Sequence, residues 1–334
     1  MDKKILQIHS SPHISSGAGV DVIMRNVVYA LLPVVAFSIY AFGLAALFTL
    51  MAAVLSCLLT EHWLCKWSRQ TTTVYDWSVA ITGIIYGLTL PPNLPLWMTL
   101  IGGVIAVSLG KFIFGGLGYN PFNPALVGRA FLQAAFPTAM TTWSAAFGAQ
   151  RFTSLPASTL TFPLTSPQYD SLSGATPLAA MKFNQQPTDA MDLLLGLTSG
   201  SLGETCAVLI LLGGLYLIAR NMMNWRIPVG IFFTVIVLSA LFHFANPHRY
   251  PDAVFMLFSG GLMLGAMFMA TDMVASPITN LGCFIYGALI GTLVVIIRLW
   301  GGMPEGVMYA ILFANAVSPH IDRFIQPTPF GHRS

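Results

Sequence analysis

A short polar run in the middle of the chain presents a hydroxyl group in a setting that suits phosphate chemistry. Thr176 is a favoured helix N-cap, Pro177 is favoured at the first helical position, and the helix formers of 178–182 follow. Free N–H groups and the helix dipole stabilise negative charge at such a helix start. No carboxylate lies within five residues of Thr176, and small neighbours leave its hydroxyl uncovered. From these residues alone, the run predicts either a plain capped helix or a phosphoester site. The run comprises Ser173, Gly174, Ala175, Thr176 and Pro177.

Several ionisable residues lie in or beside long apolar stretches, where charge is costly and marks ion pathways, and three of them are the candidates for such a role. Asp272 follows an apolar run just before a proline break, and Arg129 follows the segment NPFNPALVG. Lys111 ends the apolar run VIAVSLGK, and its alternative interpretation is a side chain that extends to the membrane surface. We expect Asp272 to be the first ion-pathway candidate, with Arg129 and Lys111 behind it.

Composition places these groups in a membrane protein. Charged residues are 8% of the chain and hydrophobic residues 55%, whereas soluble domains carry roughly 25% charged residues. The net charge of +3 is dispersed, which argues against a nucleic-acid partner. The four cysteines form no CxxC pair, so we expect no metal or iron–sulfur site from this chain alone, and the sequence offers no catalytic residue of its own.

The apolar runs predict an all-α polytopic membrane protein with about ten transmembrane helices. Helices are expected because a lipid-exposed strand would leave backbone groups unpaired, and a β-barrel would show alternation. The predicted spans are 26–42, 43–64, 77–93, 96–115, 123–137, 205–220, 227–244, 253–270, 281–299 and 305–324.

The distribution of Lys and Arg predicts that both termini face the cytoplasm, because nine of these residues then fall inside and four outside. The long loop 138–204 is then external, and its length suggests a functional role. The predicted division is a cytoplasmic lead-in (1–25), a first five-helix membrane half (26–137), the external loop (138–204), a second five-helix half (205–325) and a cytoplasmic tail (326–334).

The two halves look like inverted five-helix repeats. Each half pairs a glycine-rich helix with a Pro, Asn or Asp break, and an odd number of spans in each half would invert the second repeat. The alternative is that Gly and Pro are simply common in membrane helices.

A set of motifs in order along essentially the whole chain resembles one family of membrane redox subunits. This family comprises the D subunit of the Rnf electron-transport complex and the B subunit of the sodium-pumping NADH:quinone reductase. Besides SGAT, the motifs are SSPHI, GGLGYNPFNPALVGRAFL, GETCAVLILLGGLYLIAR, FMATDMVASPITNLGCFIYGALIG, GGMPEGVMYAILFANAVSPHIDRF and FGHRS.

The resemblance implies a covalent flavin. In this family FMN is joined by a phosphoester to the last Thr of the motif, here Thr176, with Ser173, Gly174, Ala175 and Pro177 around it. A flavin transferase installs it on the outer, periplasmic side of the inner membrane, which agrees with the topology predicted from charge. Near relatives also hold a non-covalent riboflavin.

The resemblance also implies a place in a larger assembly. The family's complex moves electrons between ferredoxin and NAD and couples this to sodium or proton transport. The expected partners are the lipid bilayer and the other Rnf subunits, A, B, C, E and G. Two other functions remain open: a transporter or channel without a redox cofactor, and a structural anchor for partner subunits.

Overall fold

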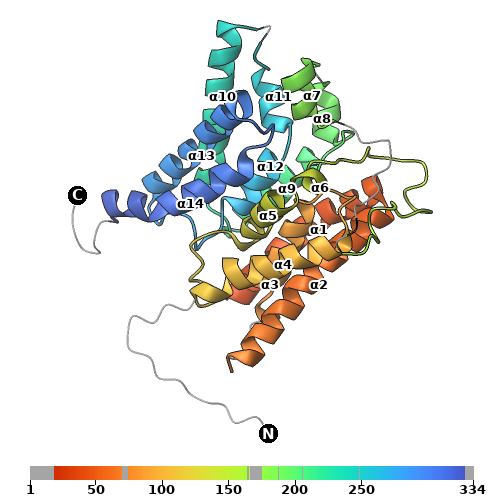
Figure 1. Ribbon diagram of the computed structural model, residues 1–334. Coiled ribbons are helices and arrows are strands. Elements are labelled where there is room, and N and C mark those ends of the chain that lie inside the picture. Colours follow the sequence, from red (N-terminus) through yellow and green to blue (C-terminus); the bar gives the residue numbers. More distant parts are fainter. Residues whose placement is uncertain are drawn as a thin grey trace.

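The computed structural model describes residues 19–69, 74–163, 165, 175–186, 188–204, 206–247 and 249–327, and throughout these ranges its regular structure is helical (Figure 1). Ser173 and Gly174 of the polar run lie outside the described residues. The all-helical prediction is therefore confirmed for the part of the chain that the structure describes.

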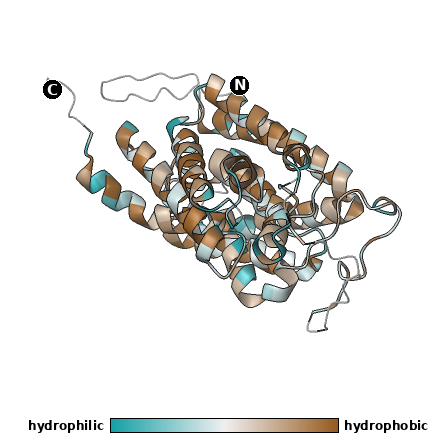
Figure 2. Ribbon diagram, turned by 90° about the horizontal axis from the view of Figure 1, so that it is seen from above, coloured by the Kyte–Doolittle hydropathy of each residue, from teal (hydrophilic) through white to brown (hydrophobic). Residues whose placement is uncertain are grey.

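Five described helical segments are long and apolar enough to cross a membrane. Large apolar side chains on them are exposed, as on Trp63 (75% exposed) and Phe244 (83% exposed), and hydrophobic residues make up much of the helical ribbon of the molecule (Figure 2). Such exposed apolar surface is what a lipid environment covers. The five are α1 (Val20–Phe42), α2 (Leu44–Trp67), α4 (Leu96–Gly110) with the 3₁₀ turn Phe112–Phe114, α10 (Arg226–Ala245) and α13 (Asn280–Trp300).

The other five predicted spans also contain helix, although they are shorter, more polar or interrupted. Four of these are α3 (Ser78–Leu88), α5 (Pro124–Ala135), α9 (Ala207–Ala219) and α14 (Val307–Phe324). The count of ten crossings stays a prediction. The helix α1 begins at Val20, inside the segment 1–25 that the sequence divides off as a lead-in.

The predicted span 253–270 is not one continuous helix. It consists of α11 (Ala253–Phe258), α12 (Leu262–Leu264) and a π-helical turn (Gly265–Met269). The break is at Gly260, whose φ of 66° favours glycine, and a Cβ there would lie 2.6 Å from Leu178 and 2.8 Å from Glu305 Oε1. The apolar composition of this span concealed the break.

The two halves repeat one packing scheme. In the first half α2 packs against α3 and α4, and α4 packs against α5. In the second half α10 packs against α11 and α13, and α13 packs against α14, while α1 and α9 join the halves. This order supports the predicted repeat, and its inversion stays a prediction.

Hydrogen bonds connect the loop between the halves to the ends of the membrane helices. Leu44 N–H donates to Arg151 O (2.9 Å), Arg151 Nε donates to Tyr40 O (2.9 Å), and Ser158 Oγ donates to Asn93 O (2.8 Å). Its helices α7 and α8 lie beside α11 at the top of Figure 1. The loop helices are α6 (Pro137–Met140), α7 (Pro177–Asn184) and α8 (Ala190–Leu195).

Candidate functional site

Thr176 is the N-cap of α7, as the sequence predicts. Its Oγ1 accepts a hydrogen bond from Ala179 N–H (3.2 Å), and Pro177 occupies the first helical position. Ser199 Oγ donates to Ala175 O (2.7 Å) and so fixes the residue before the cap. Thr176 is only 2% exposed, although it is one of the residues that line a partly open cavity. The expectation that small neighbours leave its hydroxyl uncovered is therefore wrong for this structure, in which the residue is buried.

That cavity has a volume of about 560 Å³ and lies between the start of α7, the helix α5 and the α13–α14 loop. Both charged residues of its wall, Arg129 and Glu305, come from chain segments far from Thr176 in sequence. Aromatic rings also line it: Trp143, Phe183 and Tyr309. The cavity thus combines a hydroxyl, a cation and flat apolar surfaces.

Arg129 is held in place by an ion pair. Its Nη2 donates to Glu305 Oε2 at 2.7 Å, and the side chains are 10% and 16% exposed. Its Nε is buried and has no hydrogen-bond acceptor within the described part of the chain. A buried guanidinium N–H without an acceptor at a cavity wall fits an anionic or oxygen-rich ligand.

Two further charged residues complete a buried cluster behind the cavity wall, which we call the four-charge cluster: Arg129, Arg298, Glu204 and Glu305. Arg298 in the last turn of α13 donates to the carbonyl oxygens of Met256 and Ser259 at the helix break. Glu305 Oε1 accepts from Gly261 N–H (2.9 Å). The helix break therefore supplies both carbonyls and an N–H to the cluster.

The two carboxyl groups of the four-charge cluster have opposite pKa shifts. Burial and the neighbouring Glu305 raise the pKa of Glu204 well above its ordinary value. Burial alone would also raise the pKa of Glu305, but Arg129 and the hydrogen bonds to its carboxylate lower it overall. Neither residue is recognisable as a site residue from the sequence, since each lies in a short polar segment next to an apolar run.

Lys182 fixes the segment that carries Glu305. Its Nζ donates to the carbonyl oxygens of Met303 (3.2 Å), Ile297 (3.5 Å) and Gly301 at the end of α13. Burial lowers the pKa of Lys182. The lysine at the end of α7 thereby ties the helix that starts at Thr176 to the opposite wall of the cavity.

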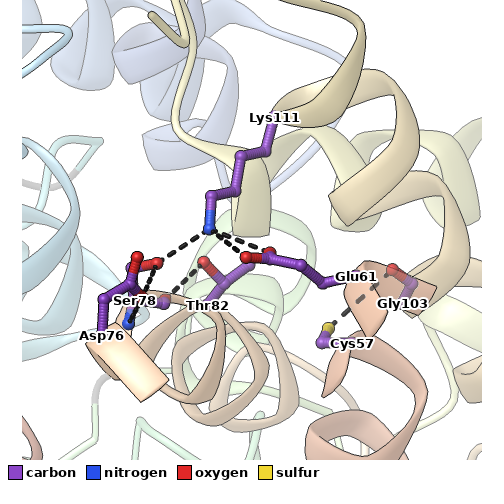
Figure 3. A network of polar contacts seen from close by, with 7 residues as sticks. All are labelled: Cys57, Glu61, Asp76, Ser78, Thr82, Gly103 and Lys111. Carbon is purple, nitrogen blue, oxygen red and sulfur yellow. Dashed lines mark hydrogen bonds and ion pairs between the residues drawn. The ribbon is translucent and has the colours of Figure 1, made fainter. Parts of the chain in front are cut away.

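A second buried ion pair lies in the first half and is shown in Figure 3. Lys111 Nζ donates to both carboxylate oxygens of Glu61 (3.0 and 2.9 Å) and to Ser78 Oγ (2.8 Å). Ser78 in turn donates to Asp76 Oδ1 (2.6 Å). Lys111 is 3% exposed, so its side chain is fully paired inside the protein and does not extend to the surface.

Asp272 and Lys111 line a smaller cavity of about 120 Å³, which Arg129 does not reach. Asp272 accepts hydrogen bonds from Asn120 Nδ2 (3.3 Å) and Val274 N–H (3.1 Å). The structure thus brings together two of the three predicted ion-pathway residues and places the third beside Thr176. Their roles in ion transport stay predictions.

Helical architecture, outward apolar surface and buried charge clusters define a membrane protein with at least one ligand-sized internal cavity. The family model described as "NQR2, RnfD, RnfE family" matches residues 7–331. The chain belongs to this family, and the resemblance inferred from its motifs is confirmed.

Its relatives are subunits of redox-driven ion pumps. The chain is 40% identical to the D subunit of the proton-translocating ferredoxin:NAD⁺ oxidoreductase complex of Clostridium ljungdahlii, over 99% of this chain and 98% of the relative. It is 39% identical to the sodium-translocating counterpart from Acetobacterium woodii, over 99% and 97%. The D subunit of the ion-translocating oxidoreductase complex of Alcanivorax borkumensis is 38% identical, over 97% and 96%. Because proton and sodium pumps match almost equally well, identity does not select the ion.

Proposed function

We propose that this chain is the D-type membrane subunit of an ion-translocating ferredoxin:NAD⁺ oxidoreductase complex and that it carries FMN on Thr176. Family membership and relatives named for this activity over nearly their full length support the first part. The observation that carries the second part is the position of Thr176: a helix N-cap that opens into a cavity of about 560 Å³.

The residues of this cavity fit a phosphate-linked flavin. First-turn N–H groups of α7 lack helical acceptors, so an ester phosphate on Thr176 Oγ1 would lie in their field. The unpartnered Nε of Arg129 offers a charged donor to a phosphate or a ring oxygen. Trp143, Phe183 and Tyr309 provide aromatic surfaces for the ring. When bound, the flavin supplies one-electron transfer, and the protein supplies attachment, orientation and charge.

The cavity that Asp272 and Lys111 line is much smaller, with about 120 Å³ against about 560 Å³. The non-covalent riboflavin of near relatives stays a prediction without an assigned site. We further propose an inner-membrane location with the α7 side in the periplasm, and assembly with the other Rnf subunits, A, B, C, E and G, after modification by a flavin transferase.

Covalent attachment is tested on a denaturing gel viewed under ultraviolet light. We expect the native chain to show flavin fluorescence at its own band and Thr176→Ala to show none. Thr142→Ala is a matched control, because Thr142 is another hydroxyl that lines the same cavity. A Thr176→Ala band as bright as the native one would refute the site.

The rival functions are separated by electron transfer in the assembled complex. A transporter without a redox cofactor predicts no fluorescence in any variant. A structural anchor predicts that the Thr176→Ala complex assembles and keeps its full electron-transfer rate. Our proposal predicts that the complex assembles and loses ferredoxin-to-NAD⁺ electron transfer.

A further inference from the structure

Glu204 and Glu305 lie on either side of the helix break. They are distant in sequence, because the helices α9 to α13 lie between them. Glu305 is also 176 positions away from its ion-pair partner Arg129. A Cβ on Gly261 would lie 3.7 Å from Glu204 Oε1 and 3.8 Å from Glu305 Oε1. Both oxygens therefore lie beside the same glycine, and each carboxyl group affects the pKa of the other.

A count of donors shows which oxygen lacks a partner. Glu305 accepts from Arg129 at Oε2 and from Gly261 N–H at Oε1. Glu204 Oε2 accepts from Ser201 N–H (3.3 Å), but Glu204 Oε1 has no donor in the part of the chain that the structure describes. A buried ionised oxygen without a donor is costly, and a second carboxylate beside it adds repulsion. A proton on Glu204 removes both penalties, because the acid donates to Glu305.

The charges that face this pair come from two helices. Arg129 on α5 bonds directly to Glu305, and Arg298 on α13 is close enough for both carboxyl groups to act on its charge. Its Nη1 and Nη2 donate to backbone carbonyls, whereas its Nε has no acceptor among the described residues. The uncharged Leu178 on α7 and Glu305 Oε1 both lie close to Gly260, whereas the cation Lys182 on α7 binds backbone carbonyls at the end of α13 and at Met303. The break itself contributes Gly261 N–H. Two ionised carboxylates would make the four-charge cluster neutral, whereas one bound proton leaves it with a net charge of +1.

We propose that Glu204 and Glu305 form a proton-binding site at the wall of the Thr176 cavity, in which Glu204 carries one proton that it shares with Glu305. Glu305 lines the cavity, and the buried Oε1 of Glu204 lies beside Gly261 together with Glu305 Oε1, so the proton is held at the cavity wall. The resulting positive charge favours a negatively charged group in the cavity. The identity of that group as a flavin rests on the proposed function, but the shared proton does not.

Infrared spectroscopy of the full-length protein tests the proton directly. We expect the native chain at neutral pH to show a protonated-carboxyl C=O band that shifts on transfer to D₂O. Glu204→Gln should lose this band, because the amide keeps the shape and the hydrogen bond but holds no acid proton. Asp252→Asn is the matched control: Asp252 is an exposed N-cap on the neighbouring helix α11, and its replacement should leave the band intact.

Two controls address misfolding. Purification of Glu204→Gln in normal amounts shows that this variant folds. Glu204→Asp retains an acid group, so it should keep an acid band at a shifted frequency if the site tolerates a shorter side chain. Spectra of native protein and folded Glu204→Gln that are identical in this region would overturn the proposal.

The same spectra on Thr176→Ala separate this inference from the flavin assignment. The acid band should survive in Thr176→Ala, because the hydrogen bonds of the Thr176 side chain and of Glu204 within the described residues go to different partners. A native chain without covalent flavin fluorescence would refute the flavin assignment but not the proton site. A native chain without an acid band that depends on Glu204 would refute the proton site but not the flavin assignment. If both hold, redox titration of the covalent flavin should show a pH-dependent midpoint potential in the native protein and a weaker dependence in Glu204→Gln.

Discussion

Each half of the molecule has a buried cationic side chain at the end of its fourth helical span, and the two cations have different hydrogen-bond partners. Lys111 follows α4 and Arg298 lies in the last turn of α13, which are the fourth helical spans of their respective halves. Lys111 has one carboxylate partner, Glu61, and a hydroxyl. Arg298 instead binds backbone carbonyls at a helix break, beside a second arginine and two carboxyl groups.

This difference distinguishes a structural ion pair from a site that has unpartnered polar groups for a ligand or a proton. In the Glu61–Lys111 pair one charge meets one charge, and both side chains are at most 4% exposed. In the four-charge cluster the Nε–H groups of both arginines and one carboxyl oxygen remain without partners among the described residues, and two members reach a large cavity. Buried polar atoms without partners beside a cavity indicate that a ligand or a proton binds there. A buried ion pair whose two charges are matched indicates a link between helices.

The largest effect is expected from breaking the closed pair. Glu61→Gln removes the negative charge and leaves Lys111 buried without a counter-charge, which costs about 3–5 kcal/mol of stability. We expect a large fall in the thermal unfolding midpoint of the purified chain, or loss of the chain from the membrane.

The double variant Glu61→Gln/Lys111→Met is the control for this prediction. It removes both charges, so it should recover most of the lost stability. A double variant as unstable as Glu61→Gln would show that Glu61 acts through contacts other than the ion pair.

A somewhat smaller effect is expected at the helix break. Gly260→Ala places a side chain at a φ of 66°, where non-glycine residues are strained by about 1–3 kcal/mol, and its Cβ collides with Leu178 and Glu305. We expect reduced stability together with weaker covalent flavin fluorescence. Gly302→Ala is the matched control, because Gly302 lines the cavity and has nothing within 4 Å of an added Cβ. Equal behaviour of the two variants would contradict the role given to the break.

Much of this arrangement could be predicted from local sequence. The start of α7 follows from an N-cap followed by proline, and the structure places Thr176, Pro177 and Lys182 as that pattern predicts. The apolar runs likewise located a helix in each predicted span. Both features depend on residues that are close together in the chain, so a single sequence contains the information.

The four-charge cluster could not be predicted in this way. Arg129 and Glu305 are 176 residues apart, and only the packing of the two halves brings them together. Glu204 and Glu305 look like ordinary polar residues at the ends of apolar runs, and their burial is a tertiary property. The break at Gly260 was hidden for a similar reason: its residues are apolar enough for a span, and the contact that forbids a side chain comes from α7 and the α13–α14 loop.

The smallest predicted effect is on the pH dependence of thermal stability, which should distinguish the four-charge cluster from the Glu61–Lys111 pair. The folded-state pKa of Glu204 is raised above its ordinary value of 4.5, so between that value and the folded pKa the folded protein binds more protons than the unfolded chain. The contribution of Glu204 to stability is therefore fully present below pH 4.5 and is lost as the pH rises through the folded pKa. In the native chain this group should lower the thermal midpoint progressively as the pH is raised above 4.5, and Glu204→Gln should reduce that slope because the amide does not titrate. A slope that is the same in native protein and Glu204→Gln would mean that the carboxyl group of Glu204 is ionised in the folded state, and the four-charge cluster would then be a balanced set of ion pairs like Glu61 and Lys111.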